Sequence, residues 1–133
     1  MTSSDRLWVL GALTTLVVGG VHVQQFMGEV GDAPTTAQLF LLNGLGAGGI
    51  VIGLVLPRFR RIAALGGIGL SVGALVSLAI ARYAEDGIFD YTEPDLRAPV
   101  VVAILSELAS VALLSAYVAS ARRGAASSPS AAT

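Results

Sequence analysis

The polar side chains within the long apolar runs of this sequence include His22, Asn43, Ser77 and Glu107. In apolar surroundings an ionised carboxylate is costly, so Glu107 must bind a proton or find a partner. His22 is the one histidine of the chain, and imidazole is the side chain that exchanges a proton near neutral pH. The residue types therefore predict a Glu107–His22 pair that carries both charges or shares one proton.

This polar set allows two interpretations and disfavours several others. The pair can simply fix the register of its helices, with Asn43 and Ser77 as additional partners, or it can bind a small ligand or a transported proton. One histidine and one carboxylate fall short of a closed zinc shell, and a single histidine gives bis-histidine haem ligation only with a second copy. No local motif joins Ser106 or Ser110 to His22 as nucleophile and base. We therefore expect no cofactor, no metal and no enzymatic activity.

The elements that hold these residues follow from the composition. The chain is 54% apolar and 13% charged, against about 25% charged residues in soluble domains, and its mean hydropathy is +0.77. Stretches of about 20 residues suffice to cross a hydrocarbon core about 30 Å thick, and four are present: Leu7–Phe26, Ala37–Leu56, Ile62–Ala81 and Ala98–Val118. No segment alternates apolar and polar residues with period two, which argues against a barrel. The sequence predicts an all-α integral membrane four-helix bundle in the lipid bilayer.

Start and stop signals divide the chain. Thr35 and Thr36 after Pro34 offer an N-cap for the second helix, Pro57 ends that helix, and Pro99 fits the first turn of the fourth. The predicted domain of four transmembrane helices spans residues 1–123. Residues 124–133 are small and polar, and we expect them to form a disordered cytoplasmic tail.

The depth of the polar residues favours a meeting between them. Counted from the outer helix ends, His22 lies about 6 Å deep, Asn43 about 9 Å and Glu107 about 13 Å, with Ser77 at the level of His22. Helical side chains lean toward the N-terminus, so Glu107 points outward and His22 inward, and the two can meet if their helices are neighbours. Polar and small residues form one stripe on the first helix: Thr15, Gly19, His22 and Gln25.

The charges predict the orientation. Six of the eight arginines flank the termini and the second loop: Arg6, Arg58, Arg60, Arg61, Arg122 and Arg123. The acids gather in the other two loops: Glu29, Asp32, Glu85, Asp86, Asp90, Glu93 and Asp95. By the positive-inside rule the protein is a multi-pass protein of the cell membrane with both termini cytoplasmic. The net charge is −1 and no basic face forms, so we expect no nucleic-acid partner.

Glycines recur at small spacings on two of the predicted helices. The second helix carries Gly44, Gly48, Gly49 and Gly53, and the third carries Gly66, Gly69 and Gly73. In lipid, helices pack through small residues that let their backbones approach. We expect these glycines to pack the bundle itself. The alternative is a homodimer or a larger membrane complex, because two glycine faces exceed what a minimal bundle needs.

The third loop, AEDGIFDYTEPDLR at 84–97, combines five acids with apolar and aromatic residues. A solvated connector is the simplest interpretation. The alternatives are a folded cap over the polar cluster and a contact site for a partner. Calcium binding through Asp86, Asp90 and Glu93 lacks the spacing of an EF-hand loop.

Two segments and one residue carry a resemblance. The run FLLNGLGAGGIVIG at 40–53, the run GIFDYTEPDLRAPVVVAILSELA at 87–109 and the histidine late in the first helix resemble small four-helix integral membrane proteins of actinobacteria. The resemblance implies the fold and the membrane, and it implies no activity.

Two functions fit these features. The first is a non-enzymatic accessory or assembly subunit whose glycine faces and acidic loop dock onto another membrane protein. The alternative is a small ligand- or proton-coupled carrier that uses an intramembrane polar site at Glu107 and His22.

Overall fold

The chain folds into four helices, each of which runs antiparallel to the next one in the sequence. The computed structural model describes residues 2–28, 30, 32–89 and 91–126. Its helices are α1 (Ser3–Met27), α2 (Pro34–Val55), α3 (Arg60–Tyr83) and α4 (Ala98–Ala126). All four are long and apolar enough to cross a membrane; the shortest has 22 residues, or about 33 Å of helix. The prediction of an all-helical chain with four such helices is confirmed.

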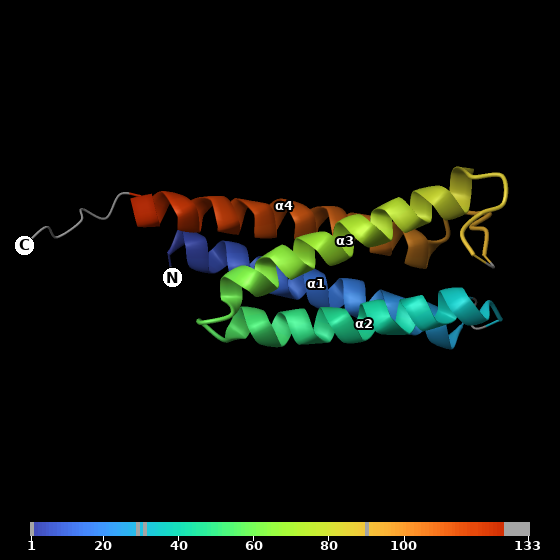
Figure 1. The fold of residues 1–133 in the computed structure, drawn as a ribbon, viewed down its shortest axis with the longest axis horizontal. Helices are drawn as coiled ribbons and strands as arrows, with labels where there is room; N and C mark the ends of the chain where they lie inside the picture. Colours follow the sequence, from blue (N-terminus) through green and yellow to red (C-terminus); the bar gives the residue numbers. More distant parts are fainter. Residues whose placement is uncertain (1, 29, 31, 90, 127–133) are drawn as a thin grey trace, which may run out of the picture.

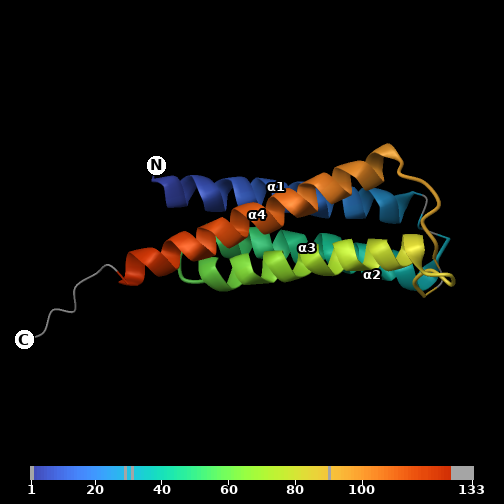
Figure 2. The same ribbon diagram turned by 90° about the horizontal axis from the view of Figure 1, so that it is seen from above.

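The helices form a ring in which each packs against its neighbours in sequence. α1 contacts α2 and α4, and α3 contacts α2 and α4. α1 also touches α3 across the diagonal, whereas no contact joins α2 to α4 among the described residues. The start of α1, the end of α4 and the α2–α3 connection lie at one end of the bundle, and the other two loops lie at the opposite end (Figures 1 and 2). We call the latter the loop end.

Local signals set helix ends that differ from the predicted ones. α1 begins at Ser3 because Thr2 and Asp5 form a capping box. α2 begins at Pro34 with Ala33 as its N-cap, so the expected capping by Thr35 or Thr36 is wrong. Proline at the first helical position already has the helical φ, which explains the earlier start.

The last helix is also longer than predicted. α4 continues from Val118 to Ala126, because the alanine-rich sequence after residue 118 favours helix. It therefore extends into the segment that was expected to be a disordered tail. Residues 127–133 of that segment lie outside the described residues.

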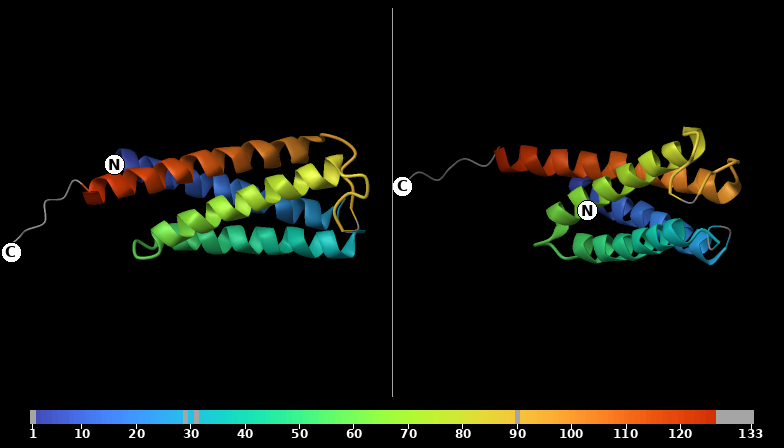
Figure 3. Two further views of the ribbon diagram at one scale, coloured as in Figure 1. Left: turned by 45° about the horizontal axis from the view of Figure 1, so that its top comes forward. Right: turned by 45° about the vertical axis from the view of Figure 1, so that its right-hand side comes forward.

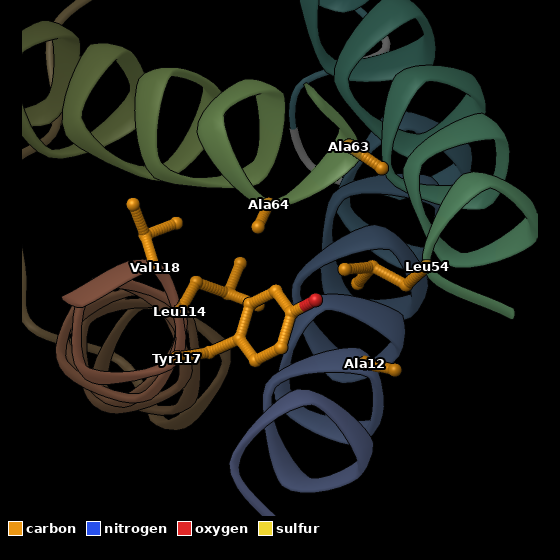
Figure 4. Close-up of a cluster of buried hydrophobic side chains, with 7 residues drawn as sticks. All are labelled: Ala12, Leu54, Ala63, Ala64, Leu114, Tyr117 and Val118. Carbon is orange, nitrogen blue, oxygen red and sulfur yellow. The ribbon is translucent and has the colours of Figure 1, made fainter. Parts of the chain in front are cut away.

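The apolar core lies in the half of the bundle away from the loop end (Figure 4). It comprises Ala12, Leu54, Ala63, Ala64, Leu114, Tyr117 and Val118. Leu114 is fully buried and fits between Gly11 and Gly67, since a Cβ on either glycine would meet its side chain. Arg60 closes the end of α2: its Nε donates to the carbonyl of Leu54 at 2.8 Å.

Outside this core, the polarity of the bundle is inverted relative to a soluble protein. Large apolar side chains face outward, among them Leu13, Leu42 and Ile62 at 54%, 62% and 70% exposure. Polar side chains are buried between the helices: Thr15, His22, Gln25, Ser71, Ser106, Glu107 and Ser110. An exterior of this kind suits acyl chains, against which apolar side chains need no cover.

Three of the seven predicted packing glycines lie at helix contacts. A Cβ on Gly44 would come within 2.5 Å of Val23 and 3.3 Å of the Gly19 carbonyl, and one on Gly53 would come within 2.8 Å of Ala63. A Cβ on Gly66 would make ordinary contact with Ile50.

The other four glycines border open space within this chain. A Cβ on Gly48, Gly49, Gly69 or Gly73 would meet nothing within 4 Å, so these positions do not pack helices of this chain together. They lie on faces that the bundle leaves open. The close approach of α1 to α2 depends instead on Gly44 and Gly19. A Cβ on Gly19 would come within 2.9 Å of Ala47.

Candidate functional site

The four polar residues predicted from the sequence come from four different helices and line one cavity. His22 lies on α1, Asn43 on α2, Ser77 on α3 and Glu107 on α4. The cavity has a volume of about 410 Å³ and lies toward the loop end of the bundle. Glu107 and His22 are buried, whereas Ser77 lies at the exposed rim. The cavity therefore has a polar inner wall and a rim open to the surroundings.

His22 and Glu107 face each other across the α1–α4 contact. Nε2 of His22 lies 3.7 Å from Oε1 of Glu107, which is beyond hydrogen-bond range and within range of a charge interaction. Nδ1 of His22 lies 2.9 Å from the carbonyl oxygen of Val18. Because a carbonyl only accepts, Nδ1 carries a hydrogen and Nε2 presents its lone pair to Glu107 when the ring is neutral. The two side chains therefore face each other without a hydrogen bond between them, and protonation of either one would create a charge interaction or a donor at this contact.

The packing of the histidine ring fixes this arrangement. The ring of Phe40 lies against the imidazole, with centroids 4.9 Å apart. Farther from the loop end, seven residues along α1 from His22 and three along α4 from Glu107, the hydroxyls of Thr15 and Ser110 are hydrogen-bonded at 2.8 Å. α1 and α4 are thus joined at two polar levels.

Two buried oxygen atoms of the cavity-lining residues have no hydrogen-bond partner. Oε2 of Glu107 and Oδ1 of Asn43 accept no hydrogen bond from the described residues. Buried polar atoms are nearly always paired, and an unpaired one costs about 1–3 kcal/mol. Most of the remaining lining is apolar, including Leu39, Leu70 and Val100. Two residues around the cavity thus carry buried, unpaired acceptors, and the cavity lining itself is largely apolar.

The sequence interpretation missed part of the lining. Gln25, Thr36, Tyr91 and Glu93 also line the cavity. Gln25 lies three residues after His22 in the polar stripe of α1, and this spacing could have predicted that it lines the same cavity. The sequence predicts Thr36 only as a capping residue. Tyr91 and Glu93 reach the cavity because the connection between α3 and α4 folds over it, and no periodicity in the sequence indicates that conformation.

The α3–α4 connection is folded over the cavity. The backbones of Ile88 and Tyr91 pair in both directions, at 2.9 and 3.0 Å. Gly87 allows the turn with a φ of +67°, where a Cβ would strike the Tyr91 carbonyl and Thr92. Glu93 then donates its backbone N–H to the carbonyl of Ala81 on α3 at 3.0 Å. Residues 88–89 and 91–93 form a cap, with Ile88, Tyr91 and Glu93 lining the cavity.

Side chains brace this cap. The Tyr91 hydroxyl donates to Oε2 of Glu93 at 2.6 Å, and Nη2 of Arg97 lies 3.1 Å from the same oxygen. Burial, together with the neighbouring Glu93 carboxylate, raises the pKa of Tyr91, so the phenol stays protonated and keeps donating. Glu93 is held by these partners. Asp90, the middle member of the proposed calcium set, lies outside the described residues, as does Glu29.

No family model, curated protein or solved structure matches this chain. The site must therefore be interpreted from its own chemistry. Its elements are the facing His22 and Glu107 side chains, two unpaired acceptors and an apolar lining under a braced cap.

Proposed function

We propose that this chain is a multi-pass membrane protein that binds a small apolar molecule carrying a hydrogen-bond donor. The observation that carries the proposal is the pair of unpaired buried oxygens on Glu107 and Asn43, both of which line the cavity of about 410 Å³. A ligand hydroxyl would supply the missing hydrogen bond, and its apolar body would fill the rest of the cavity. The facing His22 and Glu107 side chains, each of which can gain or lose a proton, make proton-coupled transport the extension of this function.

The orientation is part of the same proposal. The six arginines at the termini and the α2–α3 connection lie at the end opposite the loop end. The positive-inside rule then puts both termini in the cytoplasm and the cavity in the outer half of the cell membrane. Kinship with the small actinobacterial membrane proteins fits this layout and rests on the sequence resemblance alone.

Thermal unfolding of the protein in lipid nanodiscs tests the binding. The probe is 1-naphthol, with 1-methoxynaphthalene as the matched ring that lacks the donor. At a tenfold excess over its Kd, the naphthol will stabilise the fold by about 1.4 kcal/mol, and the ether will stabilise it less. Asn43→Leu and Glu107→Leu will abolish the difference between the two compounds.

A buried serine outside the cavity gives the control. Ser106 donates to the Ala103 carbonyl and does not line the cavity, so Ser106→Ala should retain the preference for naphthol. Equal stabilisation by the two compounds, or none by either, would refute the proposed function.

A second candidate, an accessory subunit docking onto another membrane protein, is favoured by a groove between α1 and α2. Leu16, Gly19, Gly20, Val23, Gly44, Ala47 and Gly48 line this groove, whose volume is about 380 Å³. A Cβ on Gly20 or Gly48 would meet nothing within 4 Å, so a helix of another subunit could approach closely there. Recovery of a stoichiometric second polypeptide in mild detergent, lost in Gly48→Leu, would support this candidate.

A further inference from the structure

The cavity lies between two helices that diverge. α2 and α3 are joined by a short connection at the cytoplasmic end, and α3 leans away from α2 toward the loop end (Figures 1 and 3). Residues from both helices line the cavity, from Thr36 to Asn43 on α2 and from Gly69 to Ala81 on α3. The side chains along these turns decide whether the space between the two helices is filled or open.

On the α3 side, two positions of the cavity wall carry no side chain. Gly69 and Gly73 both line the cavity, and a Cβ on either would meet nothing within 4 Å. On the α2 side, Leu39 and Leu42 line the cavity while 43% and 62% of their surface stays exposed. The cavity therefore has a mouth on the side of the bundle, between α2 and α3, and that mouth has an apolar rim.

The two ends of the cavity are closed. At the loop end, the cap of residues 88–89 and 91–93 is bound to α3 through Glu93 and Ala81 and braced by Arg97. Toward the cytoplasm, the apolar core around Leu54 and Leu114, both fully buried, fills the bundle. The side mouth lies along the apolar spans of α2 and α3, at a depth where a membrane presents acyl chains.

We propose that the ligand enters this cavity sideways from the bilayer, through the mouth between α2 and α3. This inference rests on the proposed function and defines its ligand class as an uncharged, lipid-soluble molecule with a hydroxyl group. A charged donor such as an ammonium is disfavoured, because a charge in the hydrocarbon region costs several kcal/mol. A hydroxyl crosses this region at lower cost and still donates to Glu107 or Asn43.

Nitroxide accessibility tests the side entry. The chain has no native cysteine, so a single label can be placed by Ser77→Cys at the rim, in protein reconstituted in lipid vesicles. We expect frequent collisions with oxygen, which dissolves in acyl chains, and at least tenfold fewer with a water-soluble nickel chelate. Addition of 1-naphthol will lower the oxygen accessibility of this label.

The control label is placed by Val76→Cys. Val76 is exposed on the same helix and does not line the cavity, so its oxygen accessibility will not respond to naphthol. Frequent nickel collisions at position 77, with naphthol still stabilising the protein, would overturn side entry and leave the proposed function standing. An equal response to naphthol at both labels would also overturn it. Failure of naphthol to stabilise the protein would instead refute the proposed function.

Discussion

Replacing Gly44 with leucine will make the bundle less stable than the same replacement at Gly49 by about 2 kcal/mol or more. A side chain at Gly44 must displace Val23 and then meets the backbone carbonyl of Gly19, which cannot move without separating α1 from α2. Gly49 lies on the same helix, and a Cβ there would meet nothing within 4 Å. Both variants gain the same helix propensity on losing a glycine, so their difference isolates the packing.

Reversible unfolding in mixed SDS and mild-detergent micelles measures this difference. Equal stabilities of the two variants would mean that α1 and α2 do not meet at Gly44. A lower stability of Gly49→Leu than of Gly44→Leu would put the tight contact of α2 on its other face, and it would favour a second subunit there.

The second large effect concerns the polar pair. His22→Ala leaves the carboxyl of Glu107 buried without a basic partner, and losing one member of a buried pair costs about 3–5 kcal/mol. Glu107→Gln keeps the shape and removes the charge, so it will be milder. The double variant will lose less stability than the sum of the single variants, with a coupling of about 1–2 kcal/mol, as for residues in contact.

The same unfolding assay supplies this double-mutant cycle. The control pair is Ser106→Ala with His22→Ala, since no described contact joins these two side chains. Additive effects of the Glu107 and His22 variants would show that the 3.7 Å approach of Nε2 to Oε1 has no energetic consequence.

The sequence predicted the four spans and the polar cluster for the same physical reason. Helical rise converts residue number into depth, and a polar residue in an apolar span must face other helices, so His22, Asn43, Ser77 and Glu107 could be placed in the same half of the bundle. Two other residues of α4 near Glu107 also have roles. Ala103 lines the cavity and Ser110 bonds Thr15.

The glycine contacts could not be predicted in the same way. Spacing shows that small residues share a face, but the crossing of two helices decides which face is covered. Gly44 and Gly53 lie at such contacts, whereas Gly69 and Gly73, with similar spacing, border the cavity. The cap could be stated only as one alternative for the third loop, because it depends on a long-range backbone bond from Glu93 to Ala81 and on the turn at Gly87.

The central claim, that the cavity binds a hydroxyl-bearing apolar molecule, is tested most directly by nuclear Overhauser effects from 1-naphthol to alanine methyl groups in deuterated detergent. Ala74, Ala81 and Ala103 line the cavity, whereas Ala12 and Ala64 are buried in the apolar core. The account predicts strong effects at the three cavity methyls, none at the two core methyls, and loss of the cavity signals in Glu107→Leu. Silent cavity methyls, or unchanged signals in that variant, would contradict it.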